Sequence, residues 1–180
     1  MPAAQLRVGV LIDDGFDDDE FSALSEQFEH AGTRVKIVAP FPGRLYSGRR
    51  GRLDIACDLA ARGTRAALFS ALVIPGGYSP DRLRMRHPIL DLIRDAIASH
   101  IPVGTVGHGA QVLISANAID GRTVTCWPSI AIDVTNAGGL YVDRPVVEDR
   151  GIITARKIDD IGPFVETILR LASEGRSRSD

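Results

Sequence analysis

Residues 6–39 read LRVGVLIDDGFDDDEFSALSEQFEHAGTRVKIVA, which predicts a strand, a helix and a second strand in succession. The β-branched runs at 6–12 and 34–39 are typical of buried strands. A helix is expected over residues 17–30, because its apolar side chains recur with helical spacing. The residues of that apolar face are Phe21, Leu24 and Phe28. A strand–helix–strand unit of this kind predicts two parallel, neighbouring strands.

The rest of the chain continues the alternation of strands and helices. Further strands are expected at 68–74, 102–106, 124–126, 140–142, 146–147 and 152–155, and helices at 88–100, 110–117, 130–137 and 161–172. This order predicts one α/β domain over residues 1–172, with a single doubly wound, mostly parallel, flavodoxin-like sheet. Residues 173–180 are expected to form a polar, frayed tail. Residues 40–54 predict an exposed hairpin or loop whose arginines form a solvated face rather than a phosphate site.

Composition excludes several classes of protein. The 180 residues are 44% hydrophobic and 24% charged, as in an ordinary soluble domain. A net charge of −2 argues against a nucleic-acid partner, and no apolar run is long enough to suggest a membrane span. The N-terminal residues do not resemble a signal peptide, so a cytoplasmic location is the default expectation.

The sequence also indicates a site without a cofactor. The two cysteines and four histidines lack the spacing of a metal site, so no metal is expected. Neither a phosphate-binding loop nor a dinucleotide-binding glycine turn is found. The expected partner is a small-molecule substrate.

Three segments that follow predicted strands carry unusual chemistry: Asp13–Glu20, Pro75–Arg82 and Val106–Gly109. In open α/β sheets, ligands bind beyond the carboxyl ends of the strands. The last segment, Val106-Gly107-His108-Gly109, predicts a sharp strand-to-helix turn of the nucleophile-elbow kind. Such a turn aims free helix N–H groups at an anion, although a Gly-His-Gly turn alone is weak support for a site.

Several motifs, in order along the chain, resemble the ThiJ/PfpI family of the class I glutamine amidotransferase-like proteins, and in particular its PfpI-like branch. The motifs are Val73-Ile74-Pro75-Gly76-Gly77, Pro80-Asp81-Arg82-Leu83, Gly107-His108-Gly109-Ala110-Gln111 and Cys126-Trp127-Pro128-Ser129-Ile130, followed by Asn136-Ala137-Gly138 and Val142-Asp143. The resemblance extends from Val8 to about Leu171. It implies the flavodoxin-like fold and glyoxalase, deglycase, peptidase-like or isocyanide hydratase activity.

The resemblance also implies site residues, and here the chain departs from the family pattern. Gly107 occupies the position of the family's nucleophilic cysteine, and His108 matches the histidine that follows it. Asp17 is carried over as the acid after the first strand, although its alternative role is a helix N-terminal cap. Trp127 replaces a tyrosine, and Asp81 stands where relatives place a glutamate that reaches a neighbouring subunit. The expected substrate-binding residues are Gly76, Gly77, Asp81, Gly107, Gly109, Cys126 and Trp127, and the expected catalytic residues are Asp17 and His108.

Three functional interpretations follow from Gly107. Covalent catalysis needs an attacking side chain, and glycine has none. The first interpretation is an enzyme that uses acid–base catalysis on a small metabolite, as an isomerase, lyase, hydratase or cyclase, with Asp17 transferring the proton. The second is a non-catalytic binding homologue, and the third is an ordinary glyoxalase, deglycase or hydrolase with an engineered cysteine-to-glycine change. His108 and Trp127 have purely structural alternatives, and relocation of the nucleophile to Cys126 is disfavoured. The resemblance further implies a homo-oligomer, a dimer or higher.

Overall fold

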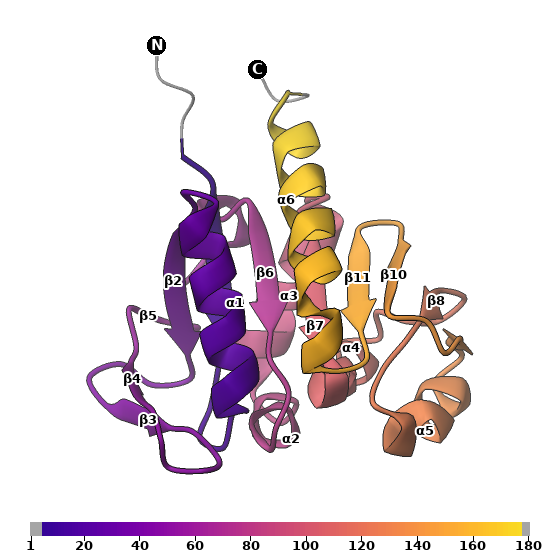
Figure 1. Cartoon of the computed structure of the whole chain (residues 1–180), viewed down its shortest axis with the longest axis horizontal. Helices are drawn as coiled ribbons and strands as arrows, with labels where there is room; N and C mark the ends of the chain where they lie inside the picture. The colour runs from indigo at the N-terminus through magenta and orange to yellow at the C-terminus, as the bar shows by residue number, and fades with distance from the viewer. Residues whose placement is uncertain (1–4, 178–180) are drawn as a thin grey trace.

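A seven-stranded, mostly parallel sheet lies at the centre of the computed structural model, which describes residues 5–177 (Figure 1). Its strand order is β10-β11-β7-β6-β1-β2-β5, and the β10–β11 pair is antiparallel. The strands are β1 (Arg7–Leu11), β2 (Arg34–Ala39), β5 (Leu59–Ala60), β6 (Ala71–Ile74), β7 (Val103–Val106), β10 (Val146–Asp149) and β11 (Ile152–Ala155). The central strands β6 and β7 are buried at every residue, as expected for strands covered on both faces.

Helices cover both faces of this sheet. α1 (Asp18–His30) and α6 (Ile161–Ser177) lie on one face, seen in front in Figure 1, and α3 (His87–Ala98) and α4 (Ala110–Ser115) lie behind it. Each layer of helices has its own buried cluster. Phe28 and Phe164 belong to the cluster under α1 and α6, whereas Ile93 and Leu113 belong to the cluster under α3 and α4. The predicted doubly wound α/β fold is confirmed.

Smaller elements surround the sheet. α2 (Ser79–Leu83) and α5 (Ala131–Asn136) are short helices, and 3-10 turns occur at Ala66–Leu68, Gly107–Gly109, Pro128–Ile130 and Ile158–Asp160. β3 (Leu45–Ser47) and β4 (Asp54–Ala56) form an antiparallel hairpin, and β8 (Thr123–Val124) pairs with β9 (Leu140–Tyr141). The hairpin expected within residues 40–54 is confirmed, but it is not exposed throughout, because Tyr46 of β3 is fully buried.

The element boundaries differ from the predictions at several places. The strand expected from residue 68 begins at Ala71, because residues 66–68 form a 3-10 turn. The two-residue strand β5 was not predicted. Helix α6 runs to Ser177, five residues beyond the helix end expected at residue 172, and residues 178–180 lie outside the described part of the chain.

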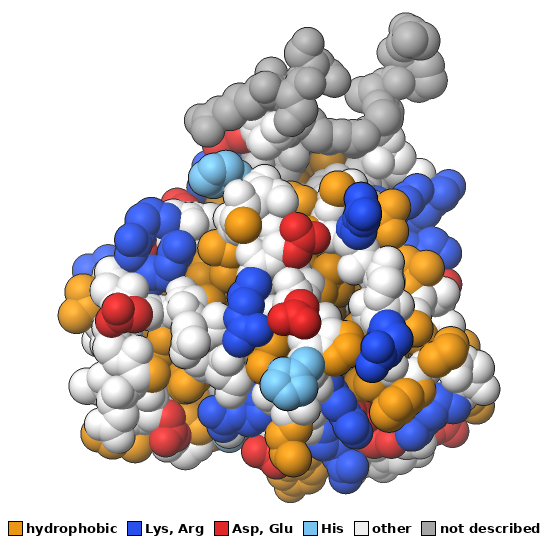
Figure 2. All heavy atoms as spheres, turned by 180° about the vertical axis from the view of Figure 1, so that it is seen from behind, with side chains coloured by type: hydrophobic (Ala, Val, Ile, Leu, Met, Phe, Trp, Pro, Cys, Tyr) orange, Lys and Arg blue, Asp and Glu red, His pale blue; other side chains and the backbone are white. Residues whose placement is uncertain are grey.

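Charged and apolar side chains are mixed on the surface. Figure 2 shows the face opposite to that of Figure 1, where acidic and basic side chains are interspersed among apolar ones. Within residues 5–177, no helix has both the length and the apolar composition that crossing a membrane requires.

Candidate active site

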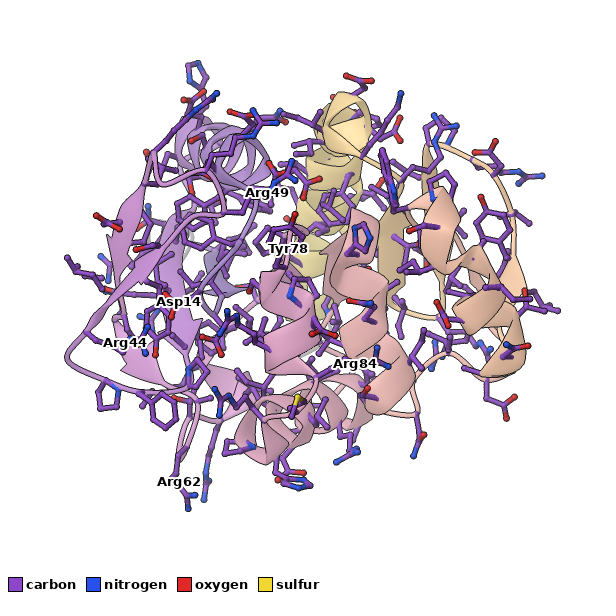
Figure 3. The ribbon with its side chains drawn as sticks, turned by 90° about the horizontal axis from the view of Figure 1, so that it is seen from below. Asp14, Arg44, Arg49, Arg62, Tyr78 and Arg84 are labelled. Atoms are coloured by element: carbon purple, nitrogen blue, oxygen red, sulfur yellow. The ribbon has the colours of Figure 1, made fainter. Side chains whose placement is uncertain are left out.

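Three connections meet at the carboxyl ends of β1, β6 and β7. Phe16, after β1, forms a β-bridge with Gly77, after β6. Gly76, next to it, lies against the turn after β7, because a Cβ atom built there would be 3.4 Å from the backbone nitrogen of His108. The strand ends singled out in the sequence are therefore brought together, and Figure 3 looks onto this edge of the molecule.

Gly107 makes the sharp turn from β7 into the following helices. Val106 is extended, with φ −113° and ψ 135°, and Gly107 has φ +55°, in the left-handed region that favours glycine. Gly107 is buried, yet a Cβ atom built there would make only ordinary contacts. Within the described chain, its neighbours inside 4 Å would be the carbonyl oxygen of Arg156 at 3.4 Å and Oε1 of Glu20 at 3.6 Å. The turn therefore leaves space for a small side chain in front of a carboxylate.

Glu20 supplies that carboxylate from the first turn of α1. Glu20 is 9% exposed, and its Oε2 accepts a hydrogen bond of 2.7 Å from the backbone N–H of Gly76. Burial raises the pKa of Glu20 from its ordinary 4.5 to about 7. The hydrogen bond from the Gly76 N–H lowers this pKa, the negative charge of Asp17 raises it, and the positive charge of Arg49 lowers it. Glu20 is thus balanced between its acid and base forms near neutral pH.

Asp17, the acid expected from the sequence, has a different position. It is the N-cap of α1, and its Oδ1 accepts the N–H groups of Asp19 at 3.1 Å and Glu20 at 3.0 Å. Its Oδ2 lies 2.7 Å from a guanidinium nitrogen of Arg49. The structure therefore places Glu20, and not Asp17, directly in front of Gly107. Both oxygens of Asp17 are engaged in fixing the helix and the arginine.

His108 and Trp127 form the more open side of the site. Their rings stack with centroids 6.2 Å apart, and Nε2 of His108 lies 3.4 Å from the hydroxyl of Ser129. Trp127 is 42% exposed, which argues against a role in core packing. Burial lowers the pKa of His108, and the nearby Arg49 charge lowers it further, so the imidazole is neutral at pH 7.

The other residues expected at the site are spread over different environments. Gly77 has φ +85° and packs against the backbone of Gly15 and Phe16, while Gly109 packs against the carbonyl of Ile74. Asp81 is exposed on α2. Cys126 is fully buried in a core cluster, and burial raises the pKa of its thiol to about 12, so the thiolate is not available near neutral pH.

Sequence reasoning missed two residues of this site, Glu20 and Arg49. The signal for Glu20 is its spacing from Leu24, four residues on, which puts a carboxylate on the buried face of α1. Arg49 gives no comparable signal, because it is one of several arginines in an exposed loop. As for metals, within residues 5–177 no group of three or more His, Cys, Asp or Glu side chains is arranged to hold an ion.

The fold agrees with that of known proteins. Residues 6–171 match the DJ-1/PfpI family. The chain belongs to the DJ-1/PfpI family. It is 38% identical to Protein/nucleic acid deglycase 2 of Escherichia coli K12 over 166 residues, which are 92% of this chain and 96% of the relative.

A second relative and a solved structure also match 92% of this chain. A deglycase of Pyrococcus abyssi is 32% identical over 92% of this chain and 99% of its own length. Among solved structures, a two-domain protein of Anabaena variabilis with DJ-1/ThiJ/PfpI-like and ferritin-like domains superimposes with a TM-score of 0.89 at 32% identity. That match covers 92% of this chain and 48% of the two-domain chain.

Proposed function

We propose that this chain is an acid–base enzyme of the DJ-1/PfpI family that acts on a small carbonyl-containing metabolite without a covalent intermediate. Gly107 stands at the position of the family's nucleophile in this proposal, and Glu20 transfers the proton. The reaction is of the isomerase, lyase, hydratase or cyclase type, and its proposed step is proton removal or addition at a carbon next to a carbonyl.

One observation carries the proposal: Oε1 of Glu20 lies 3.6 Å from the Cβ position of Gly107. With glycine there, the space that a cysteine side chain would fill is open to a substrate carbon. A carboxylate with a pKa near 7 suits general acid–base catalysis at neutral pH. In the reaction step, the carboxylate of Glu20 takes the proton and the carbon–hydrogen electron pair moves to the carbonyl oxygen, forming an enolate. Neutral His108 offers a hydrogen bond to that oxygen.

Exchange of carbon-bound protons with deuterium oxide tests the proposal without knowledge of the natural substrate. Hydroxyacetone and pyruvate are suitable probes, and proton NMR follows the loss of their α-proton signals. Wild-type protein is expected to catalyse exchange, and a Cys57→Ser/Cys126→Ala variant without thiols should keep this activity. Glu20→Gln should lose about 10²- to 10⁴-fold of the rate. Absence of exchange by the wild type, or an unchanged rate in Glu20→Gln, would contradict the proposal and favour the non-catalytic binding interpretation.

Deglycase activity is a second candidate, because the relatives in Escherichia coli and Pyrococcus abyssi carry that name. Against it stand the positions of the two cysteines. Cys126 is buried in the core, and Cys57 lies half-buried in the connection between β4 and β5. Consumption of methylglyoxal that is lost when Cys57 and Cys126 are replaced by serine and alanine, and is unchanged in Glu20→Gln, would favour this second candidate.

A further inference from the structure

The loop between β3 and β4 is fastened to the first turn of α1 by the carboxylate of Asp18. This carboxylate is buried and accepts backbone N–H groups from Arg50 at 2.9 Å, Arg52 at 3.0 Å and Leu53 at 3.1 Å. Gly48 packs directly against the same carboxylate, so closely that a Cβ atom would collide with it. The loop is therefore held in one conformation next to the site.

The three arginines of this loop have different ion-pair partners. Arg50 and Arg52 both pair with the carboxylate of Asp19, which is 40% exposed. Arg49 instead donates its backbone N–H to the carbonyl of Phe16 at 2.9 Å, and its guanidinium reaches Asp17 at 2.7 Å. In Figure 3, Arg49 lies between the ends of α1 and α6. Of the loop's three arginines, Arg49 is thus the one turned toward the site.

Arg49 has capacity for a second anion. A guanidinium carries five N–H donors, and one nitrogen of Arg49 contacts Asp17. The Arg49 side chain is 31% exposed, so it is accessible from solvent and not sealed by its ion pair with Asp17. The arginine also lies close enough to Glu20 and His108 for its charge to act on both groups. A molecule that reacts at Glu20 and extends by a few atoms would therefore meet Arg49.

We propose that Arg49 anchors a carboxylate group of the substrate, so that the substrate class is a small α-keto or α-hydroxy acid. The inference rests on the proposed function for the position of the reacting carbon. A planar carboxylate matches the two-pronged guanidinium edge. A phosphate dianion fits less well, because Asp17 and Glu20 place negative charge beside a single arginine.

Binding can be measured apart from turnover through the imidazole of His108. An anion that neutralises Arg49 removes part of the positive field at His108, so the pKa of His108 should rise. The experiment follows the His108 ring C–H resonance in ¹H–¹³C NMR during titration with pyruvate, using a His108→Gln variant to assign it among the chain's four histidines. Hydroxyacetone, in which a hydroxymethyl group replaces the carboxylate, is the uncharged comparison, and inorganic phosphate is the third probe.

Pyruvate is expected to shift the His108 resonance saturably in wild-type protein, with hydroxyacetone and phosphate at least about 10-fold weaker. Arg49→Gln should weaken pyruvate binding by at least about 10-fold, and Arg49→Lys should be intermediate because it keeps the charge but not the planar fork. Arg50→Gln, the matched control, should bind as the wild type does. Glu20→Gln should still bind pyruvate while losing exchange, which separates this inference from the proposed function.

Three results would overturn the proposal. The first is wild-type pyruvate affinity in Arg49→Gln with an otherwise native spectrum. The second is equal binding of hydroxyacetone and pyruvate, and the third is phosphate binding as tight as that of pyruvate. If Arg49→Gln fails to fold, the Arg49→Lys comparison still decides, because unchanged pyruvate affinity in that variant contradicts a carboxylate held by the guanidinium fork.

Discussion

Oε1 of Glu20 lies 3.6 Å from the point where a Cβ atom on Gly107 would stand. This relationship joins the first turn of α1 to the sharp turn after β7. It places a buried carboxylate, with a pKa of about 7, behind a space that only a glycine leaves empty. The proposed chemistry depends on both residues, because a side chain at residue 107 would stand between the carboxylate and a substrate.

Introducing a thiol at residue 107 tests this geometry. Gly107→Cys should fold, since its Cβ atom would make ordinary contacts at 3.4 and 3.6 Å. Its free energy of unfolding should be lower than that of the wild type by about 1–2 kcal/mol, because residue 107 has φ +55°. The wild type should have negligible activity with methylglyoxal, and the variant should gain it together with a fast-reacting thiol. Methylglyoxal turnover that persists in a Cys57→Ser/Cys126→Ala variant, with no gain of activity in Gly107→Cys, would contradict this prediction.

The pKa of Glu20 predicts a specific pH dependence of stability. Between pH 4.5 and about 7 the folded protein holds a proton on Glu20 that the unfolded chain has released, so folding becomes less favourable as the pH rises through this range. The free energy of unfolding of Glu20→Gln, relative to wild type, should therefore increase by about 3 kcal/mol across the range. Urea unfolding of both proteins at about pH 5 and about pH 8 measures this difference. A constant difference would show that the pKa of Glu20 is ordinary.

Asp18 should be important for stability and for the position of Arg49. Burial alone would raise its pKa, but the N–H groups of Arg50, Arg52 and Leu53 outweigh burial and hold the pKa below 3.8. Asp18→Asn should lower the free energy of unfolding by about 2–3 kcal/mol at neutral pH. Because the pKa is lowered, the cost should shrink as the pH falls below about 4. Asp19→Asn, on the exposed side, is the matched control and should cost under about 1 kcal/mol in the same urea experiment.

Association of two or more copies remains a prediction from the family resemblance, with an interface near Asp81. The exposed apolar side chains that flank α2 favour it, since Tyr78 is 66% exposed and Met85 is 78% exposed. Light scattering at micromolar concentration should give at least the mass of a dimer, and Met85→Glu should lower it. A strict monomer would exclude a site completed by a neighbouring copy.

The sequence alone was sufficient for the layers of the fold, because hydrophobic periodicity reports which face of each element is buried. β2 and β11 begin and end where the apolar runs do. β5 was missed because two residues carry no periodicity, and its pairing with β2 is set by tertiary contact.

The site was harder to predict because side-chain direction within a helix turn decides it. Asp17 and Glu20 are both acids at the start of α1, and either one could face the turn after β7. The N-cap carboxylate binds its own helix, whereas the residue three positions later points inward and meets the N–H of Gly76. The position of Arg49 was equally hard to predict, since it depends on the hydrogen bonds by which Asp18 holds the loop.

The pH dependence of α-proton exchange tests the role of Glu20 most directly. The rate with pyruvate should rise with pH and level off with a midpoint near 7, the pKa of Glu20. Asp17→Asn should keep the pH-dependent rate, because asparagine still caps α1, and should lower its midpoint by less than about one unit, because the charge of Asp17 no longer raises the pKa of Glu20. Glu20→Gln should lose the pH-dependent rate by about 10²- to 10⁴-fold while keeping its fold. The same profile in Glu20→Gln as in wild type, or a profile abolished only in Asp17→Asn, would contradict the account.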